Sequence, residues 1–246
     1  MYPTIEIIIP AFKAESTILE TIKSVECQIS PPDFLTAIIR KNGANDPTLK
    51  IVKNNIAINL LIQKNVGLYD AMNEGILKSQ ADYILILNAD DLISPNFINH
   101  VREEIKNQDF DILFMPVFRE GGLRSEFLSN RTWLGYDYAV PGHSASMIVK
   151  RNLHKKIGLY NTNIKYSADY DLIMRALRNN LIIRHFGDSR KAFGIFRPAG
   201  FSSTASYRYK RLEEFRFRYA GNRRISDIIY CFIIFPLQFM YSFFKG

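Results

Sequence analysis

The sequence has few cysteines and histidines, and it lacks several motifs that would assign a function directly. Two cysteines in 246 residues provide neither a disulfide framework nor a paired-cysteine zinc site. The glycine-rich phosphate loop that ends in Gly-Lys-Ser/Thr, the Gly-x-Gly-x-x-Gly dinucleotide turn and the His-Glu-x-x-His zinc motif are all absent. Enzymes that depend on those three motifs therefore find no support in the sequence.

The N-terminus lacks an apolar run long enough for a signal peptide. The run at residues 7–9 is short, whereas a signal peptide needs about 7–15 apolar residues. We therefore expect a protein that stays in the cytoplasm, where the thiols of Cys27 and Cys231 would remain reduced.

Charge and length limit the class of protein. The net charge of +8 favours anionic partners: nucleotide phosphates, acidic lipid head groups or nucleic acid. An apolar content of 47% is typical of a globular protein, and 246 residues suffice for one large domain or a domain with an appendage.

The first half of the chain alternates between strand and helix patterns. Thr17-x-x-Glu20 has the spacing of a capping box, and Asp46-Pro47 reads as an N-cap followed by proline at the first helical position. Helices are expected after these two signals, after Gly67 and at residues 95–107. Apolar runs between them predict strands at residues 5–9, 35–39, 58–62 and 83–87. This order predicts an α/β fold whose mostly parallel sheet is flanked by helices.

The second half is less regular. It predicts strands at residues 111–118 and 145–149, and a loop that becomes a helix within 166–179. We expect one domain over residues 1–206, divided into halves at 1–110 and 111–206. Residues 207–246 form a separate C-terminal segment.

An acidic turn follows the predicted strand at residues 83–87. The apolar run ends in Asn88, Asp90 and Asp91, and ligands of α/β proteins bind at the carboxyl ends of strands. Two adjacent carboxylates repel each other unless a cation or hydrogen bonds offset their charge. Such oxygen clusters suit Mg²⁺ or Mn²⁺ with a phosphorylated substrate. The alternative is a solvated turn that caps the next helix.

Five segments, in this order, resemble the family 2 glycosyltransferases, which have the nucleotide-sugar-binding GT-A fold. Residues 7–12 are similar to the first strand with its donor-binding turn, and residues 67–76 to the helix start beside the diphosphate. Residues 87–91 are similar to the metal-binding acidic motif, residues 167–175 to the catalytic-base segment, and residues 197–203 to a late Gly-x-Ser loop. The resemblance covers roughly residues 5–203. It implies a GT-A-type, Rossmann-like sheet, with the nucleotide sugar and metal in the first half and the acceptor in the second.

The resemblance implies an inverting glycosyltransferase that moves a sugar from a nucleotide-sugar donor to a hydroxyl of a glycan or lipid-linked glycan. Bacterial surface polysaccharide biosynthesis would be the setting. Asp90 is the expected ligand of Mn²⁺ or Mg²⁺, Asn88 would face the ribose or a metal-bound water, and Asp91 would support the turn or contact the diphosphate or acceptor.

Asp169 is the candidate general base that takes the proton of the acceptor hydroxyl. A direct displacement at the anomeric carbon would invert its configuration. The alternative is that Asp169 is the N-cap of a helix at residues 170–178. Asp171 would face away from Asp169 on that helix.

Other candidate contacts are weaker because each has a structural alternative. Expected donor contacts are Pro10, Ala11, Glu15, Asn42, Asp70 and Asn73. Asp70 could instead complement the helix dipole, and Glu15 could be a loop acid. Lys41 and Asn42 stand where the family commonly has acids that read the base, which leaves the nucleotide open. Trp133 and His143 are candidate acceptor or diphosphate contacts, but each could be structural.

The C-terminal segment is basic and aromatic at first and then apolar. Residues 207–224 carry seven basic residues against two glutamates, and residues 228–244 are mostly apolar. We expect peripheral contact with an anionic membrane, at the cytoplasmic face of the inner membrane, because the apolar stretch is short for a spanning helix. The alternative is a helix that packs on the domain or on a partner subunit.

Two other function classes remain as alternatives. A nucleotidyltransferase has a related fold, but it usually has a glycine-rich basic loop where this chain has Pro10-Ala-Phe-Lys-Ala14. A non-enzymatic protein that binds nucleic acid or membrane would explain the net charge. We expect no nucleic-acid partner, because the positive charge gathers beside apolar residues near the C-terminus.

Overall fold

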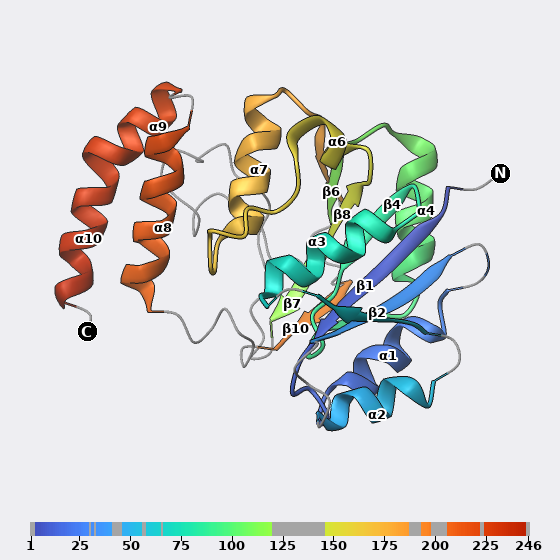
Figure 1. Cartoon of the computed structure of the whole chain (residues 1–246). Coiled ribbons are helices and arrows are strands. Elements are labelled where there is room, and N and C mark those ends of the chain that lie inside the picture. The colour runs from blue at the N-terminus through green and yellow to red at the C-terminus, as the bar shows by residue number, and fades with distance from the viewer. Residues whose placement is uncertain are drawn as a thin grey trace.

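The computed structural model describes residues 3–29, 31, 33–40, 46–55, 58–64, 66–119, 146–186, 193–197, 206–221 and 224–244. These residues form a large sheet with helices on both faces, a small second sheet and a group of C-terminal helices at one side (Figure 1).

The large sheet has seven strands in the order β3-β2-β1-β4-β8-β6-β9. Only β8 runs against its neighbours β4 and β6; the other pairings are parallel. The strands are β1 (Ile5–Ala11), β2 (Phe34–Arg40), β3 (Asn59–Gln63), β4 (Tyr83–Ile86), β6 (Ile112–Phe114), β8 (Met147–Lys150) and β9 (Ile183–His185). The mostly parallel sheet expected from the β-α alternation is therefore confirmed.

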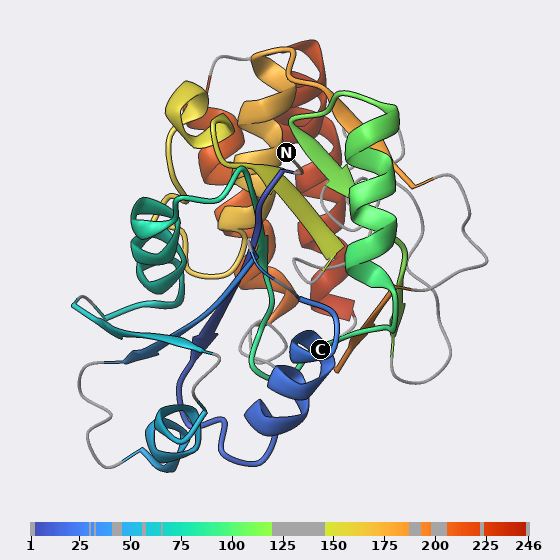
Figure 2. The same ribbon diagram turned by 90° about the vertical axis from the view of Figure 1, so that its right-hand side faces the viewer.

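The two faces of the sheet carry separate apolar cores, because side chains alternate along each strand. In β1, Ile5, Ile7 and Ile9 belong to one core and Ile8 to the other. The first core includes α1 (Ile18–Glu26), α2 (Pro47–Lys53) and α4 (Phe97–Asn107); the second includes α3 (Leu68–Lys78), α6 (Leu153–Ile157) and α7 (Ala168–Arg178). Figure 2 shows α3 and α4 on opposite sides of the strands.

Helix α3 crosses the sheet closely at Gly75. A Cβ atom at this position would lie 2.7 Å from Ile38 Cδ1 and 2.8 Å from Ile8 Cγ2. The absence of a side chain therefore sets how near α3 approaches β1 and β2.

The predicted strand at residues 111–118 is instead two strands in two sheets. β6 ends at Phe114, and β7 (Val117–Arg119) joins the small sheet with β5 (Leu92–Ile93) and β10 (Gly194–Phe196). Pro116 lies between them and has no N–H for the ladder, while its carbonyl accepts a hydrogen bond from Phe193 N at 2.7 Å. The apolar pattern did not reveal the break.

The expected strand at residues 5–9 placed Pro10 just after its end, but the first strand continues through Pro10. Pro10 lies inside β1, where it pairs in register with Ile38 of β2. The Ile8 carbonyl accepts a hydrogen bond from Leu87 N, on the β4 side of β1. The backbone nitrogen of Pro10, two residues on, faces the same side. The β4 pairing ends at Ile8, and the missing N–H of Pro10 costs no ladder hydrogen bond there.

One expected capping box and one expected helix start are also corrected, although α1 itself begins at Ile18 directly after Thr17, as expected. Thr17 makes no side-chain capping bond at the start of α1, and Glu20 instead forms an ion pair with Arg197 at 2.7 Å. The helix expected from residue 95 begins at Phe97, after Asn96 with a φ of 67°. By contrast, the Asp46 N-cap is confirmed, because its side chain accepts a hydrogen bond from Thr48 N.

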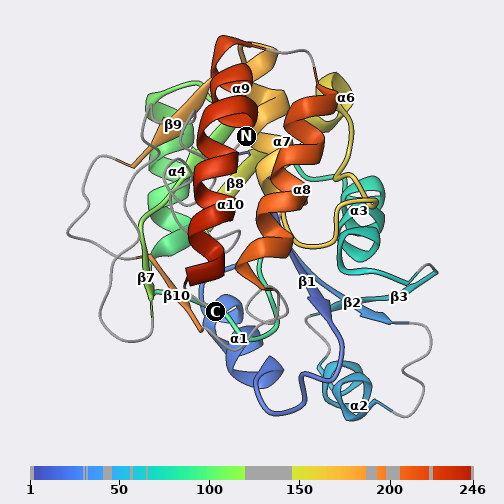
Figure 3. The same ribbon diagram turned by 90° about the vertical axis from the view of Figure 1, so that its left-hand side faces the viewer.

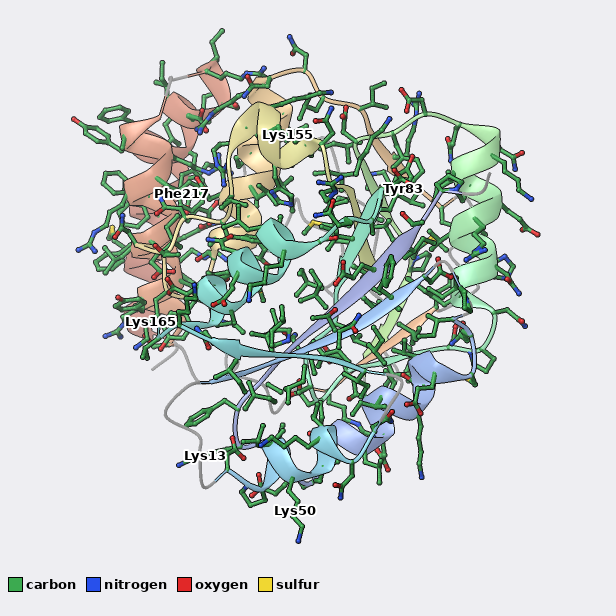
Figure 4. All side chains as sticks on the ribbon, turned by 45° about the vertical axis from the view of Figure 1, so that its right-hand side comes forward. Lys13, Lys50, Tyr83, Lys155, Lys165 and Phe217 are labelled. Atoms are coloured by element: carbon green, nitrogen blue, oxygen red, sulfur yellow. The ribbon has the colours of Figure 1, made fainter. Side chains whose placement is uncertain are left out.

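The C-terminal helices are α8 (Tyr207–Ala220), α9 (Ile225–Ile229), the π-helix η4 (Tyr230–Ile234) and α10 (Phe235–Phe244). Figure 3 shows α8 and α10 side by side, with α7 behind them. In Figure 4 the labelled Phe217 lies on α8, and its ring packs edge-on against Tyr170 of α7 at 5.7 Å between centroids.

Buried ion pairs join these helices to α7. Arg218 contacts Glu214 at 3.1 Å and Asp227 at 3.5 Å, and Asp227 also contacts Arg178 of α7 at 2.9 Å. Arg211 pairs with Glu214, and the side chains of Arg211 and Arg218 are at most 2% exposed. Two of the basic residues expected near lipid head groups therefore point inward instead. Among the described residues, no helix is both long and apolar enough to cross a bilayer.

Candidate active site

Four of the segments singled out in the sequence lie at the carboxyl edge of the large sheet. The turns after β1 and β4 leave the sheet at this edge because the two strands are parallel neighbours. Helix α3 leads into β4, and α7 leads into β9, which runs in the same direction as β4. The N-terminal ends of α3 and α7 therefore face the same edge (Figure 1). Ligands bind at this edge in open α/β sheets.

The acidic turn after β4 is held by hydrogen bonds. Asp91 is fully buried; its carboxylate accepts hydrogen bonds from Asn88 Nδ2 at 2.9 Å and from Arg197 N at 3.2 Å. Thr21 of α1 donates to the Ala89 carbonyl at 3.0 Å. Asp91 thus supports the turn, and Asn88 is oriented by it.

Asp90 lies between these two residues and is partly exposed. Its carboxylate is the one on this turn that solvent reaches, because Asp91 is buried. No group of three or more His, Cys, Asp or Glu residues suited to a metal ion occurs in the described part of the chain. This arrangement fits Mg²⁺ or Mn²⁺, which commonly bind through one or two carboxylates and take further oxygens from substrate phosphates and water.

The turn after β1 is fixed by Asp46. Its carboxylate accepts a hydrogen bond from Lys13 N at 2.7 Å, beside Pro10 and Ala11, which are both buried. Burial would raise the pKa of Asp46, but the hydrogen bonds from Lys13 and Thr48 outweigh it and hold that pKa below its ordinary value. Glu15 is exposed on the next turn.

The start of α3 presents Asp70 at the same edge. A Cβ atom at Gly67 would lie 2.2 Å from Asp70 Oδ2, so the carboxylate rests against the glycine backbone. Asn73, one turn later, uses both ends of its amide on Tyr160: Nδ2 donates to the Tyr160 carbonyl at 2.8 Å, and Oδ1 accepts from Tyr160 N at 2.9 Å. Asn73 therefore ties α3 to the loop before α7.

Asp169 lies in the first turn of α7 and is partly exposed. The helix begins at Ala168 after Ser167, so Asp169 is inside the helix and the alternative that made it the N-cap is wrong. Burial raises the pKa of the Tyr160 hydroxyl, and the charge of Asp169 raises it further. The Tyr160 hydroxyl therefore stays protonated.

Asp171 has a structural role on the same helix. It is buried and pairs with Arg175 at 2.9 Å, and Arg175 in turn donates to the carbonyls of residues 157, 158 and 159. As expected from the helical spacing, Asp171 does not share the environment of Asp169. The pair holds the loop that leads to Tyr160.

Three predicted contacts fall outside the described residues: Asn42, Trp133 and His143. Of the late segment at residues 197–203, only Arg197 is described. The proposed roles of these three side chains remain predictions.

The sequence did not single out three residues that shape this edge. Tyr69 Oη accepts a hydrogen bond from Ala168 N at 3.2 Å, Glu213 accepts from the backbone of Lys165, and Arg197 joins α1 to the acidic turn. One signal was available: Glu213 and Glu214 are the only acids among seven basic residues, a pattern typical of paired charges.

Comparisons with known proteins identify relatives. The sequence profile of Glycosyl transferase family 2 matches residues 6–158. The chain is 26% identical over 190 residues to an uncharacterized glycosyltransferase of Rickettsia typhi, an alignment that covers 72% of this chain and 59% of that protein. This chain thus spans little more than half the length of that relative.

Two solved structures share the fold. S. aureus TarS 1–349 in complex with UDP-GlcNAc is similar with a TM-score of 0.70 and 19% identity, covering 98% of this chain and 73% of that one. The mannosyltransferase of Pyrobaculum calidifontis in complex with GDP-Man and Mn²⁺ gives a TM-score of 0.66 at 11% identity, with 98% and 73% covered. The expected GT-A-type fold is thereby confirmed.

Proposed function

The chain belongs to glycosyl transferase family 2, and we propose that it transfers a sugar from a nucleotide-sugar donor to a hydroxyl of a glycan or lipid-linked glycan. The observation that carries this proposal is that Asp90 and Asp169 come from the end of β4 and the start of α7, which face one edge of the sheet. We assign it to bacterial surface polysaccharide assembly, because such an acceptor suits both the family and the apolar C-terminal helices.

The donor binds at the turns after β1 and β4 and at the start of α3. Helix N-termini attract phosphate because their first N–H groups lack helical partners. Asp90 would hold Mn²⁺ or Mg²⁺ together with the diphosphate, and a bound ion would supply positive charge that offsets the charge of the leaving group. Support comes from the similar structures, one bound to UDP-GlcNAc and one to GDP-Man with Mn²⁺. Asn88 faces the ribose or a bound water.

Asp169 is the general base of the proposed reaction. The acceptor hydroxyl oxygen forms a bond to the anomeric carbon while its proton passes to the Asp169 carboxylate. The bond from that carbon to the diphosphate oxygen breaks on the opposite side, and the nucleoside diphosphate leaves. One displacement therefore inverts the anomeric configuration.

Thermal-shift screening tests the donor site. UDP-, GDP-, CDP- and dTDP-sugars are each added with Mn²⁺ to the wild-type protein and to the variant Asp90→Ala. We expect at least one donor to raise the melting temperature of the wild type, because ligands stabilise the state that they bind. The same donor should have no such effect on Asp90→Ala. A panel without any stabilising donor, or an equal shift in both proteins, would remove the donor-site assignment.

Asp169→Asn tests the base. An amide cannot take the proton, and general base catalysis contributes about 10²–10⁴-fold. Release of nucleoside diphosphate from the selected donor should fall by a factor in this range, whereas the donor should still stabilise the variant. Unchanged release would assign the base elsewhere.

The C-terminal helices are the proposed membrane contact. Their exposed apolar side chains, 44% to 78% accessible, come from α9, η4 and α10: Ile225, Ile228, Phe232, Ile233, Leu237, Met240 and Tyr241. Between residues 225 and 241 the only charged side chain is Asp227, which is buried in its ion pairs. An uncharged apolar helical face of this kind suits the interface of a bilayer.

Two surface substitutions test the membrane contact without disturbing the core. Phe232→Gln combined with Leu237→Gln should reduce sedimentation with vesicles that contain phosphatidylglycerol. Leu77→Gln is the matched control, because Leu77 is 69% exposed and belongs to α3 rather than to these helices. If the double variant and the control sediment alike, the face does not bind the membrane. Loss of a dimer in the double variant would assign the face to a second subunit instead.

A further inference from the structure

Glu213 of α8 binds the segment that leads into α7. Its Oε1 accepts a hydrogen bond from Lys165 N at 2.7 Å; its Oε2 accepts from Tyr166 N at 3.0 Å and from Ser167 Oγ at 3.0 Å. The residue is 6% exposed, and Figure 4 shows the labelled Lys165 beside the C-terminal helices. Hydrogen bonds to an ionised carboxylate are stronger than neutral ones. Glu213 therefore fixes three consecutive residues that precede Asp169.

The same start of α7 is held from the other side by α3. Tyr69 accepts the hydrogen bond of Ala168 N, and its ring stacks on Tyr160 at 5.6 Å between centroids. Tyr69 precedes Asp70 in the chain, and Ala168 precedes Asp169. The position of Asp169 relative to the start of α3 thus depends on Tyr69 from one helix and Glu213 from another.

Other side chains of α8 hold the helix on the domain. The neighbouring Glu214 and Arg218 form the buried ion pairs, and Phe217 packs on Tyr170. These contacts fix the backbone of α8 independently of the Glu213 side chain. Its carboxylate faces backbone N–H groups just before the positive end of α7, where a negative charge is favourable.

We infer that Glu213 is a positioning residue for Asp169, so that the C-terminal helix α8 is part of the catalytic architecture. This inference rests on the proposed function. A base that is displaced by about 1 Å can lose roughly 10²-fold in rate although substrate binding is intact. The C-terminal segment thereby has a role in the reaction that is separate from any membrane contact.

Glu213→Gln is the test, because it keeps the shape of the side chain. The amide has one acceptor oxygen and one NH₂ group, so it cannot accept from all three donors. Glu103→Gln is the matched control: the Glu103 side chain is 66% exposed on α4 and faces solvent. Three quantities are compared with the wild type: hydrogen exchange of the Lys165 and Tyr166 amides, KM for the selected donor, and kcat for release of nucleoside diphosphate.

We expect faster exchange at both amides in Glu213→Gln, an unchanged KM for the donor, and a kcat lower by about 10- to 100-fold. The Glu103→Gln variant should match the wild type in all three. Faster exchange with an unchanged kcat would overturn the inference, and so would a fall in kcat that is matched by a loss of donor binding. A wild type that releases no nucleoside diphosphate from any donor would instead remove the proposed function on which the inference rests.

Discussion

Replacing Asp227 by asparagine should weaken the ion pairs that hold the C-terminal helices on α7. The Asp227 carboxylate is 1% exposed and lies 2.9 Å from Arg178 Nη2 and 3.5 Å from Arg218 Nη1. Without its charge, Arg178 and Arg218 would each lose an ion-pair partner, while Arg218 would keep its contact with Glu214. The substitution changes the charge of the side chain and very little of its size.

The cost follows from the two contacts. At an effective dielectric constant of about 20, Coulomb's law gives an attraction of roughly 5 kcal/mol for each pair. The variant also escapes the desolvation of the carboxylate, which offsets part of that loss. Removal of one partner from a buried ion pair costs about 3–5 kcal/mol. We expect the free energy of unfolding to fall by that amount.

Urea unfolding followed by circular dichroism measures the change. Asp109→Asn is the matched control, because Asp109 forms a 3.0 Å ion pair with Lys150 but its side chain is 70% exposed. An exposed pair contributes about 0–1 kcal/mol. If Asp227→Asn costs no more than Asp109→Asn, the buried network does not hold the C-terminal helices on the domain, and the reasoning fails.

Two further predictions concern the core. Gly75→Ala should lower the free energy of unfolding by about 1–3 kcal/mol, since the new Cβ would overlap Ile38 and Ile8; a gain would show that α3 can move away from the sheet. Burial lowers the pKa of His154 to about 4, despite the Gly158 carbonyl, and the charge of Arg175 acts in the same direction. The unfolded chain therefore takes up a proton first as the pH falls from 6.5 towards 4, and stability should drop by roughly 3 kcal/mol over this window. Urea unfolding of the wild type and of His154→Gln should show a flatter pH dependence in the variant; equal slopes would contradict the assignment.

Much of the first half of the fold could be predicted from local patterns. Alternating apolar runs and the Asp46-Pro47 signal depend on neighbouring residues, and they correctly indicated a parallel sheet. The capping box at Thr17 failed because Glu20 found a partner 177 residues away in the chain, Arg197. The strand at residues 111–118 failed because the tertiary structure divides it between two sheets.

The candidate site shows the same limit. Strand ends and helix starts in the sequence indicated Asp90 and Asp70, because those positions follow from element boundaries. Asp169 was indicated by the resemblance to the glycosyltransferase family. The residues that position them act across long separations: Tyr69 reaches Ala168 over 99 residues, and Glu213 reaches Lys165 over 48. Sequence spacing carries no information about such contacts. The basic C-terminal residues were likewise placed on the surface because their buried acidic partners could not be identified.

The central claim, that Asp90 binds a donor together with a divalent ion, is tested most directly by calorimetric titration. The nucleotide sugar selected by the thermal-shift panel is titrated into the wild type, Asp90→Asn and the Asp109→Asn control, each with Mn²⁺ and with a chelator. We predict that binding to the wild type and the control requires Mn²⁺. In Asp90→Asn, binding with Mn²⁺ should fall to the level that the wild type has with the chelator. Equal affinity of Asp90→Asn and the wild type in Mn²⁺ would contradict the account.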